Sequence, residues 1–168
     1  MKKWTSAEAV ASSIFDGATI AITGPGGGLL EPNAILAAIE ARFPETGHPR
    51  NLTVVHALGV GNGQGSGLRR FAHSGMVSRV IGGHWVWSSA MQKLAETGQI
   101  EGYSFPGGAI ATLFREIGAG RPGVITRVGL RTFVDPRNGG GKLNDATTED
   151  LVELIEIDGK EFLRYKPL

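Results

Sequence analysis

Glycine is the residue type whose placement in this chain suggests chemistry. Residues 22–32, ITGPGGGLLEP, hold four glycines and two prolines where a buried, strand-like run gives way to a run with helical spacing. Consecutive backbone N–H groups ahead of a helix can form a site for an anion. The segment matches neither the dinucleotide-binding nor the P-loop pattern, and no lysine follows it to reach a phosphate. A tight turn without a ligand and an anion site therefore both remain open.

Glu31 closes this glycine segment, directly before Pro32 and the helical run. A carboxylate at that point is stabilised by the helix N-terminus, and the alternative is a general base that faces the glycine amides. A second glycine-rich segment, residues 59–67, follows the next strand-like run. Its G-x-G-x-G spacing is a weak signal for a nucleotide, because no acidic residue follows at the distance that a ribose contact needs.

The remaining polar residues give no complete catalytic set. None of the four histidines has the i, i+4 spacing of a helical metal site, and the chain has no cysteine, so no metal site is predicted. His84 and Trp85 are candidate pocket residues, because they stand beside glycines at a predicted strand end. Trp85 and Trp87, two residues apart, are more typical of the core than of a stacking surface. Three arginines in the irregular segment 123–137 could bind a carboxylate or phosphate, or satisfy loop carbonyls and surface acids: Arg127, Arg131 and Arg137.

Hydrophobic spacing predicts the elements that must position these residues. Strands are expected at residues 18–23, 52–58, 77–83 and 100–105. Helices are expected at residues 5–15, 33–43, 68–75, 89–98 and 106–120, the first of them opened by a capping box from Thr5 to Glu8. A hairpin is expected across Asp158-Gly159, within residues 149–166. This order predicts an α/β fold: an open, mainly parallel sheet with helices on both faces, plus a C-terminal β-hairpin. Ligands of such sheets bind beyond the carboxyl ends of the strands, where the glycine segments fall.

Composition limits the partners of the protein. The formal net charge of +1 gives no strong field for nucleic acid or an anionic membrane. No apolar run approaches the length of a membrane span, and the start MKKWTSAEAV lacks the apolar core of a signal peptide. The absence of cysteine fits a reducing cytoplasm, where we expect the protein to act. One domain is predicted over residues 1–168, and its final hairpin, with nothing after it to cover it, predicts a subunit or fragment of a larger assembly unless the hairpin packs on its own domain.

Five ordered segments together resemble the amino-terminal domain of the family I coenzyme A transferases. They are TGHPRNLTVVHALGVGNGQGSGLRRFAHSGMVSRVIGGHW, IEGYSFPGGAI, REIGAGRPGVITRVGLRTFVDPR, GGGKLN and TTEDLVELIEIDGKEFLRYK. The resemblance runs from about residue 5 to the end. Within the family, the segments look most like those of the fused acetate- or propionate-type acyl-CoA transferases. It is specific, because the order of the segments, their spacing and their residue identities all match the amino-terminal domain.

The resemblance implies one half of a two-domain enzyme. The other half would supply a glutamate that attacks an acyl-CoA thioester and then carries coenzyme A as a glutamyl thioester until an acceptor carboxylate removes it. No catalytic nucleophile is therefore expected in this chain, which should be inactive alone. The implied partners are the complementary C-terminal half, acyl-CoA and small carboxylates, within a higher homo- or hetero-oligomer. Coenzyme A is implied as a substrate, and no covalently bound cofactor is expected.

The resemblance also gives the glycines a chemical reason. Each transfer step passes through a tetrahedral oxyanion, which backbone N–H groups stabilise well. Gly26, Gly27 and Gly28, with Glu31 after them, match the family's glycine turn, and Gly107 and Gly108 match a second turn at the acyl site.

Two departures from the family pattern affect the expected chemistry. Residues 105–108 read FPGG where relatives often read F-P-Q-G, so Gly107 lacks a side-chain amide expected to bind the oxyanion. The alternatives are that its backbone N–H or a water replaces that amide, that the pocket is enlarged for a bulkier acyl group, or that transferase activity is weak. Arg131 stands where relatives tend to have glycine; it is a candidate ligand for a second substrate carboxylate, and the alternative is that it blocks the site. The alternatives on this fold are an acyl-CoA thioester hydrolase, an enzyme that opens a ring on a CoA ester, and a non-catalytic binding module.

Overall fold

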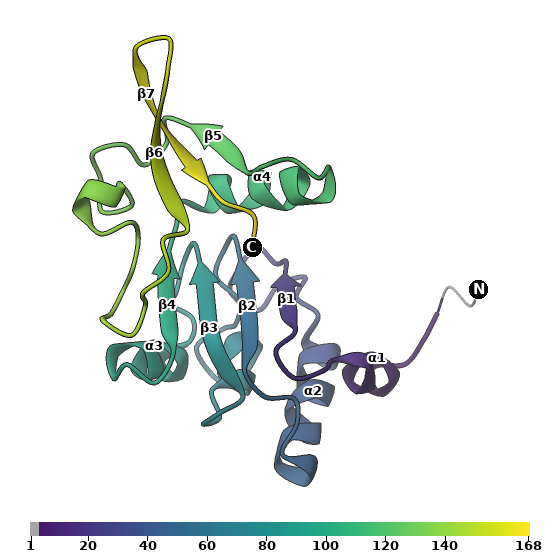
Figure 1. The fold of residues 1–168 in the computed structure, drawn as a ribbon. Coiled ribbons are helices and arrows are strands. Elements are labelled where there is room, and N and C mark those ends of the chain that lie inside the picture. The colour runs from purple at the N-terminus through teal and green to yellow at the C-terminus, as the bar shows by residue number, and fades with distance from the viewer. Residues whose placement is uncertain (1–3) are drawn as a thin grey trace.

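The computed structural model describes residues 4–168. The first three residues of MKKWTSAEAV, the segment that lacks the features of a signal peptide, lie outside the described residues. Figure 1 shows the helices and strands along the chain: α1 Ala7–Ser13, β1 Thr19–Ile22, α2 Asn33–Thr46, β2 Leu52–His56, η1 Gly67–Phe71, β3 Val77–Gly82, α3 Ser89–Glu96, β4 Glu101–Ser104, α4 Gly107–Gly118, β5 Val124–Thr126, η2 Pro136–Asn138, β6 Val152–Ile157 and β7 Lys160–Tyr165. No helix within residues 4–168 combines the length and the apolar character needed to cross a bilayer.

The first four strands form a parallel sheet in the order β1-β2-β3-β4. The register pairs Ile22 with His56 and His56 with Gly82, so the carboxyl ends of β1, β2 and β3 are level. All four strands point the same way in Figure 1. Because the strand order follows the chain and such crossovers are right-handed, the connecting elements α2, η1 and α3 lie on one face of the sheet.

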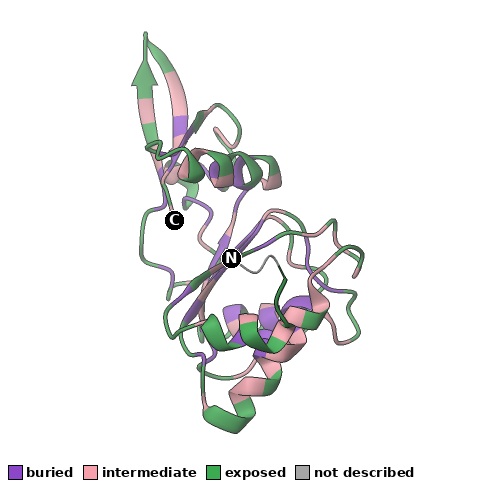
Figure 2. Ribbon diagram, turned by 90° about the vertical axis from the view of Figure 1, so that its right-hand side faces the viewer, coloured by how far each residue is buried: buried purple, intermediate pink, exposed green. Residues whose placement is uncertain are grey.

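Two apolar clusters cover the two faces of this sheet. Val54 and Val80 pack with the buried residues of α1, α2, η1 and α3, whereas the next residues along the same strands, Val55 and Ile81, pack with α4 and the last strands. Side chains alternate between faces along a strand, which explains the division, and Figure 2 shows the buried segments lying between the layers. The predicted α/β sheet with helices on both faces is confirmed, although α4 is the single long helix of the second face and shares it with strands.

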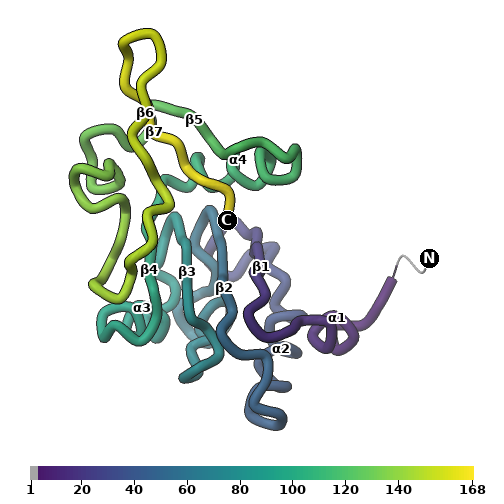
Figure 3. Tube along the Cα trace, in the orientation of Figure 1, coloured from purple at the N-terminus to yellow at the C-terminus, as the bar shows by residue number. Residues whose placement is uncertain are grey.

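Strands β5, β7 and β6 form a small antiparallel sheet in that order. The predicted hairpin is confirmed, with Asp158 and Gly159 at φ 50° and 69° in its turn. Its base is not bare, because Leu163 and Tyr165 are fully buried against α4, and the hairpin thus packs on its own domain. Figure 3 shows the chain returning from the hairpin to end beside the tips of β1 and β2.

Two local predictions were wrong. The N-cap of α1 is Ser6, whose hydroxyl accepts a hydrogen bond from the Ala9 N–H at 3.2 Å, and Thr5 makes no such bond. The spacing of Ala34, Ile35, Ala38 and Ile39 predicts that they form the apolar face of α2, but the structure centres the buried face on Leu36 and Ile39 and leaves Ala34 exposed. The first error arose because adjacent Thr and Ser offer equivalent caps, and the second because short alanine side chains mark a helical face weakly.

Candidate functional site

Four loops meet at the carboxyl edge of the parallel sheet. They follow β1, β2, β3 and β4 and comprise residues 23–32, 57–66, 83–88 and 105–106. In Figure 1 this edge faces α4 and the small sheet. The fold therefore brings together the glycine segments that are separate in the sequence.

The first loop has a backbone that only glycine adopts without strain. Gly26, Gly27 and Gly28 have φ values of 86°, 70° and 80°, in the left-handed region that a Cβ disfavours. Within residues 4–168, the N–H groups of Gly26 and Gly27 have no acceptor, whereas the Gly28 N–H donates to Glu31. Two of the three predicted amides are thus available to a ligand.

Glu31 connects the first loop to the second. Its Oε1 accepts hydrogen bonds from the N–H of Gly28 at 3.2 Å and from the N–H of Gly61 at 2.8 Å. Its Oε2 is buried and has no hydrogen-bond partner among residues 4–168. A carboxylate that accepts two backbone hydrogen bonds fixes both loops, a positioning role that neither sequence interpretation of Glu31 included.

The second loop is closed on itself by two glycines. Asn33 Oδ1 accepts from the Gly67 N–H at 3.1 Å, which ties the loop to the start of α2. A Cβ on Gly67, whose φ is 66°, would collide with the backbone of Gly61, whereas a Cβ on Gly63, at φ 77°, would meet nothing within 4 Å. The loop therefore needs glycine at residue 67 for space as well as for conformation.

Gly67→Ala is expected to lower the free energy of unfolding by about 3 kcal/mol, since backbone strain and overpacking add together. The matched control Gly63→Ala has the same backbone strain without the collision, so it is expected to lower the free energy of unfolding by about 1 kcal/mol. Urea unfolding of both variants measures the difference. Equal losses would show that Gly67 is not packed against Gly61.

His56 holds the start of the second loop from the end of β2. Its ring is fully buried, and its Nδ1 lies 2.7 Å from the Leu58 carbonyl oxygen, which makes Nδ1–H the donor. Burial lowers the pKa of His56 to about 4 and the nearby His84 adds to this, so the imidazole is neutral at pH 7. The remaining ring nitrogen Nε2 and the Trp85 Nε1–H both have no partner among residues 4–168.

Acid is expected to destabilise the protein through His56. The unfolded chain protonates this imidazole below its ordinary pKa of 6.5, whereas the folded protein does so only near 4. The unfolded state therefore gains protons first, and roughly 2 kcal/mol of stability is lost between pH 7 and pH 5. Urea unfolding at the two pH values, with His56→Gln as the non-titrating comparison, measures this loss. An imidazolium NMR signal from folded His56 at pH 5.5 would contradict the explanation.

The N-terminus of α4 packs directly on the second loop. A Cβ on Gly107 would lie 2.5 Å from the Ala57 carbonyl oxygen, and a Cβ on Gly83 would collide with the same oxygen. The N–H groups of Gly107 and Gly108 have no acceptor within residues 4–168. They lie at the positive end of a helix dipole, so this turn can bind an anion through its backbone.

A cavity of about 340 Å³ joins the first loop to the N-terminus of α4. Gly24, Leu58, Gly107, Gly108 and Phe114 are among its lining residues, and its walls are mainly apolar. Available N–H groups at the end of an apolar cavity suit a ligand with an apolar body and one polar or anionic atom.

His84 and Trp85, predicted as a pair of pocket residues, are separated by the structure. A Cβ on Gly59 would lie 2.7 Å from His84 Nδ1, so His84 borders the second loop. Trp85 packs against the core beside His56, with ring centroids 6.2 Å apart, and lines a different cavity of about 290 Å³. Trp87, interpreted from sequence as more typical of the core, instead packs on both loops, and a Cβ on Gly26 would lie 3.1 Å from its Nε1.

Large apolar side chains are exposed on three of these loops and are here called the apolar rim, of which Leu58 lines the cavity. Its members are Leu29, Leu30, Leu58, Val86 and Trp87. Leu30 is 93% exposed and has a left-handed φ of 49°. Large exposed apolar groups beside a cavity indicate a surface that a ligand or another protein covers. Within residues 4–168 no three His, Asp or Glu side chains gather closely enough to hold a metal ion.

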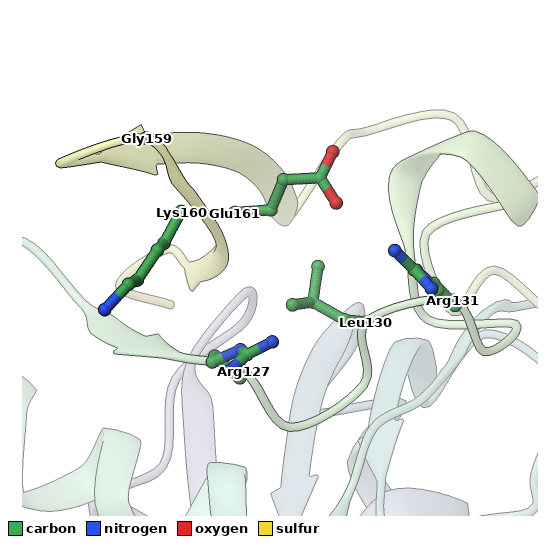
Figure 4. Close-up of a pocket in the computed structure, with 6 residues that line it drawn as sticks. All are labelled: Arg127, Leu130, Arg131, Gly159, Lys160 and Glu161. Atoms are coloured by element: carbon green, nitrogen blue, oxygen red, sulfur yellow. The ribbon is translucent and has the colours of Figure 1, made fainter.

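Arg131 does not line the glycine cavity. It borders a separate concavity of about 620 Å³ between the loop after β5 and the β6–β7 turn (Figure 4). Arg137, another of the three arginines considered from sequence, binds the buried acid Asp135 at 2.7 Å and the partly exposed acid Glu161 at 2.8 Å. The fold therefore places the predicted substrate arginine at a second site.

Comparisons with known proteins agree with this architecture. Residues 4–168 match the family model described as coenzyme A transferase. The chain is 39% identical over 97% of its length to acetate CoA-transferase YdiF of Escherichia coli (strain K12), and 44% identical over 99% to caffeate CoA-transferase of Acetobacterium woodii. A crystal structure of acyl-CoA transferase YdiF from E. coli O157:H7, in a thioester complex with CoA, superposes with a TM-score of 0.94 at 39% identity over 98% of this chain and 32% of that one. The chain spans about a third of the length of the curated relatives that it matches.

Proposed function

This chain belongs to the coenzyme A transferase family, and from that premise we propose that it forms the acyl-binding side of an acyl-CoA:carboxylate CoA-transferase. The observation that carries the proposal is the pair of available N–H groups of Gly107 and Gly108, which line one apolar cavity together with Gly24 of the first loop. The first loop also has available N–H groups on Gly26 and Gly27, which do not line that cavity. The matched relatives bear the names of CoA-transferases.

The chemistry of transfer suits these groups. A carboxylate from the complementary half attacks the thioester carbonyl carbon, and the C=O electron pair moves onto oxygen to give a tetrahedral oxyanion. The oxyanion then collapses, the C–S bond breaks, and coenzyme A leaves as a thiolate. Backbone N–H groups that are already oriented stabilise the oxyanion without reorganisation. This chain's part is to hold the acyl group and its oxygen, and the nucleophile comes from elsewhere.

The cavity supports an acyl group of modest size as the substrate part bound here. A volume of about 340 Å³ is at the lower end for ligand pockets, which run from roughly 300 to 1,000 Å³. Because residue 107 is glycine and has no side-chain amide, the oxyanion would be stabilised by backbone N–H groups.

The partner proposed for this chain is the half that carries the catalytic glutamate. The apolar rim supports it, because exposed leucine and tryptophan side chains beside a reaction site need a cover that excludes water. We also propose that residues 1–168 form one domain and that the assembly acts in the cytoplasm.

An isotope experiment tests the function. The chain and a complementary half are mixed with an acyl-CoA and labelled acetate, and the products are separated. Label in acetyl-CoA is the expected result. Release of free acid without labelled acetyl-CoA would instead support a thioester hydrolase, and no reaction despite acyl-CoA binding would support a non-catalytic binding module. The chain alone is the control and is expected to be inactive.

A further inference from the structure

We propose that the concavity between residues 127–131 and the β6–β7 turn, here called the hairpin site, binds a ligand that carries a phosphate group. It is lined by Arg127, Leu130, Arg131, Gly159, Lys160 and Glu161 and has a volume of about 620 Å³. None of these residues lines the cavity formed by the glycine loops. The hairpin site is therefore a second site, and its proposal does not rest on the transferase reaction.

Three cations reach the hairpin site from two segments of the chain. Figure 4 shows Lys160 on one side, Arg131 on the other, and Arg127 below them near Leu130. Arg127, Arg131 and Lys160 form no ion pair with any of the residues 4–168. All three side chains are exposed and line one concavity, so their combined positive potential favours a bound anion.

The acids near the hairpin site do not neutralise it. Glu161 lines it, but the carboxylate binds Arg137 at 2.8 Å. Glu156 pairs with Glu161 across the hairpin, and Asp158 lies in the turn. The lining itself carries three positive charges against one negative charge that is already compensated.

The position of Arg131 is held at a conformational cost. Its φ is 63°, in the left-handed region, where a non-glycine residue typically costs about 1–3 kcal/mol. The Arg131 N–H donates to Asp135 Oδ2 at 2.8 Å, and Asp135 is a fully buried carboxylate. Glycine would adopt this backbone without strain, so the strain indicates that the arginine side chain itself has a use.

The anchor beneath Arg131 is rigid. Arg137 donates to both oxygens of Asp135, from Nε to Oδ1 at 2.9 Å and from Nη2 to Oδ2 at 2.7 Å. These hydrogen bonds hold the pKa of Asp135 well below its usual range, so the carboxylate stays charged. Arg131 is therefore presented by a fixed turn, which lowers the entropy lost when it binds a ligand.

Phosphate matches the hairpin site better than a single carboxylate does. Two guanidinium groups offer bidentate donors that fit phosphate oxygens, and a lysine adds a compact charge. A dianion or a diphosphate can engage several of these cations at once, whereas one would suffice for a carboxylate. The volume leaves room for an organic part beyond the phosphate.

Calorimetric titration of the full 168-residue chain tests the proposal at low salt, with pyrophosphate in one arm and coenzyme A in the other. One site per chain is expected for pyrophosphate, and Arg131→Gly is expected to weaken it at least tenfold. This variant relieves the backbone strain, so it should fold with an equal or higher melting temperature. Binding of coenzyme A that Arg131→Gly weakens equally would identify the substrate as the phosphate source, and binding of pyrophosphate only would identify a free phosphate compound.

Arg69→Gln is the matched control, because Arg69 is exposed, lies on η1 away from the hairpin site, and forms no ion pair within residues 4–168. It is expected to bind pyrophosphate as the unaltered chain does. The proposal is overturned if the unaltered chain does not bind pyrophosphate, if Arg131→Gly binds it unchanged, or if Arg69→Gln loses as much affinity as Arg131→Gly.

Discussion

Glu31→Ala is expected to lower kcat/KM of the complemented enzyme by roughly 10²–10³-fold, because displacing pre-oriented donors by even 1 Å has effects of this size. The carboxylate now holds the Gly28 and Gly61 N–H groups at 3.2 and 2.8 Å. Without it the first loop is no longer fixed to the second, so Gly24 at the cavity wall and the available N–H groups of Gly26 and Gly27 lose their fixed positions.

Two further variants separate the possible causes. Glu31→Gln keeps one accepting oxygen without the charge, so about a tenfold loss is expected, since hydrogen bonds to charged groups are roughly twice as strong as neutral ones. Glu45→Ala removes an exposed carboxylate from α2, the helix that follows Glu31, and should leave kcat/KM unchanged. If Glu31→Ala and Glu45→Ala had the same kcat/KM, Glu31 would not position the loops. A base role would make Glu31→Gln as damaging as Glu31→Ala.

The sequence was sufficient to predict the order of the elements, because each strand and helix has its own hydrophobic period. It did not predict the bond from Glu31 to Gly61, which lies 30 residues away. That bond exists because β1 and β2 are neighbours with level ends, and strand adjacency is a property of the whole sheet. The Asn33–Gly67 bond was missed for the same reason.

The placement of side chains in irregular loops was the least predictable feature. Trp85 and Trp87 follow β3, where the alternation of a strand no longer determines which side chain points inward. The structure turns Trp85 into the core and Trp87 onto the glycine loops. Arg131 was expected near the acyl site because its motif follows the others in the family order. It lies elsewhere because β5 leaves α4 to join the small sheet, which takes the following loop with it.

Gly107 is the residue for which sequence and structure lead to opposite predictions. The family comparison treats it as a lost glutamine, so Gly107→Gln would restore an oxyanion donor and raise activity. In the structure, the Cβ of any side chain at residue 107 would lie 2.5 Å from the Ala57 carbonyl oxygen. The second loop would have to move, and both the cavity wall at Leu58 and the amides beside it would move with it.

Gly107→Gln is therefore expected to lower kcat/KM by about 10²-fold, and Gly107→Ala by nearly as much, because displacement of the loop rather than loss of a donor causes the effect. Gly118→Ala at the other end of α4 is the control, since a Cβ there meets nothing within 4 Å, and the substitution should slightly stabilise the helix. Steady-state kinetics and thermal unfolding of the three variants decide the matter. Higher activity in Gly107→Gln would show that the loop yields easily and that the oxyanion lacks a side-chain donor. A loss shared by Gln and Ala would show that residue 107 is glycine because α4 must approach the backbone of the second loop closely to present its N–H groups.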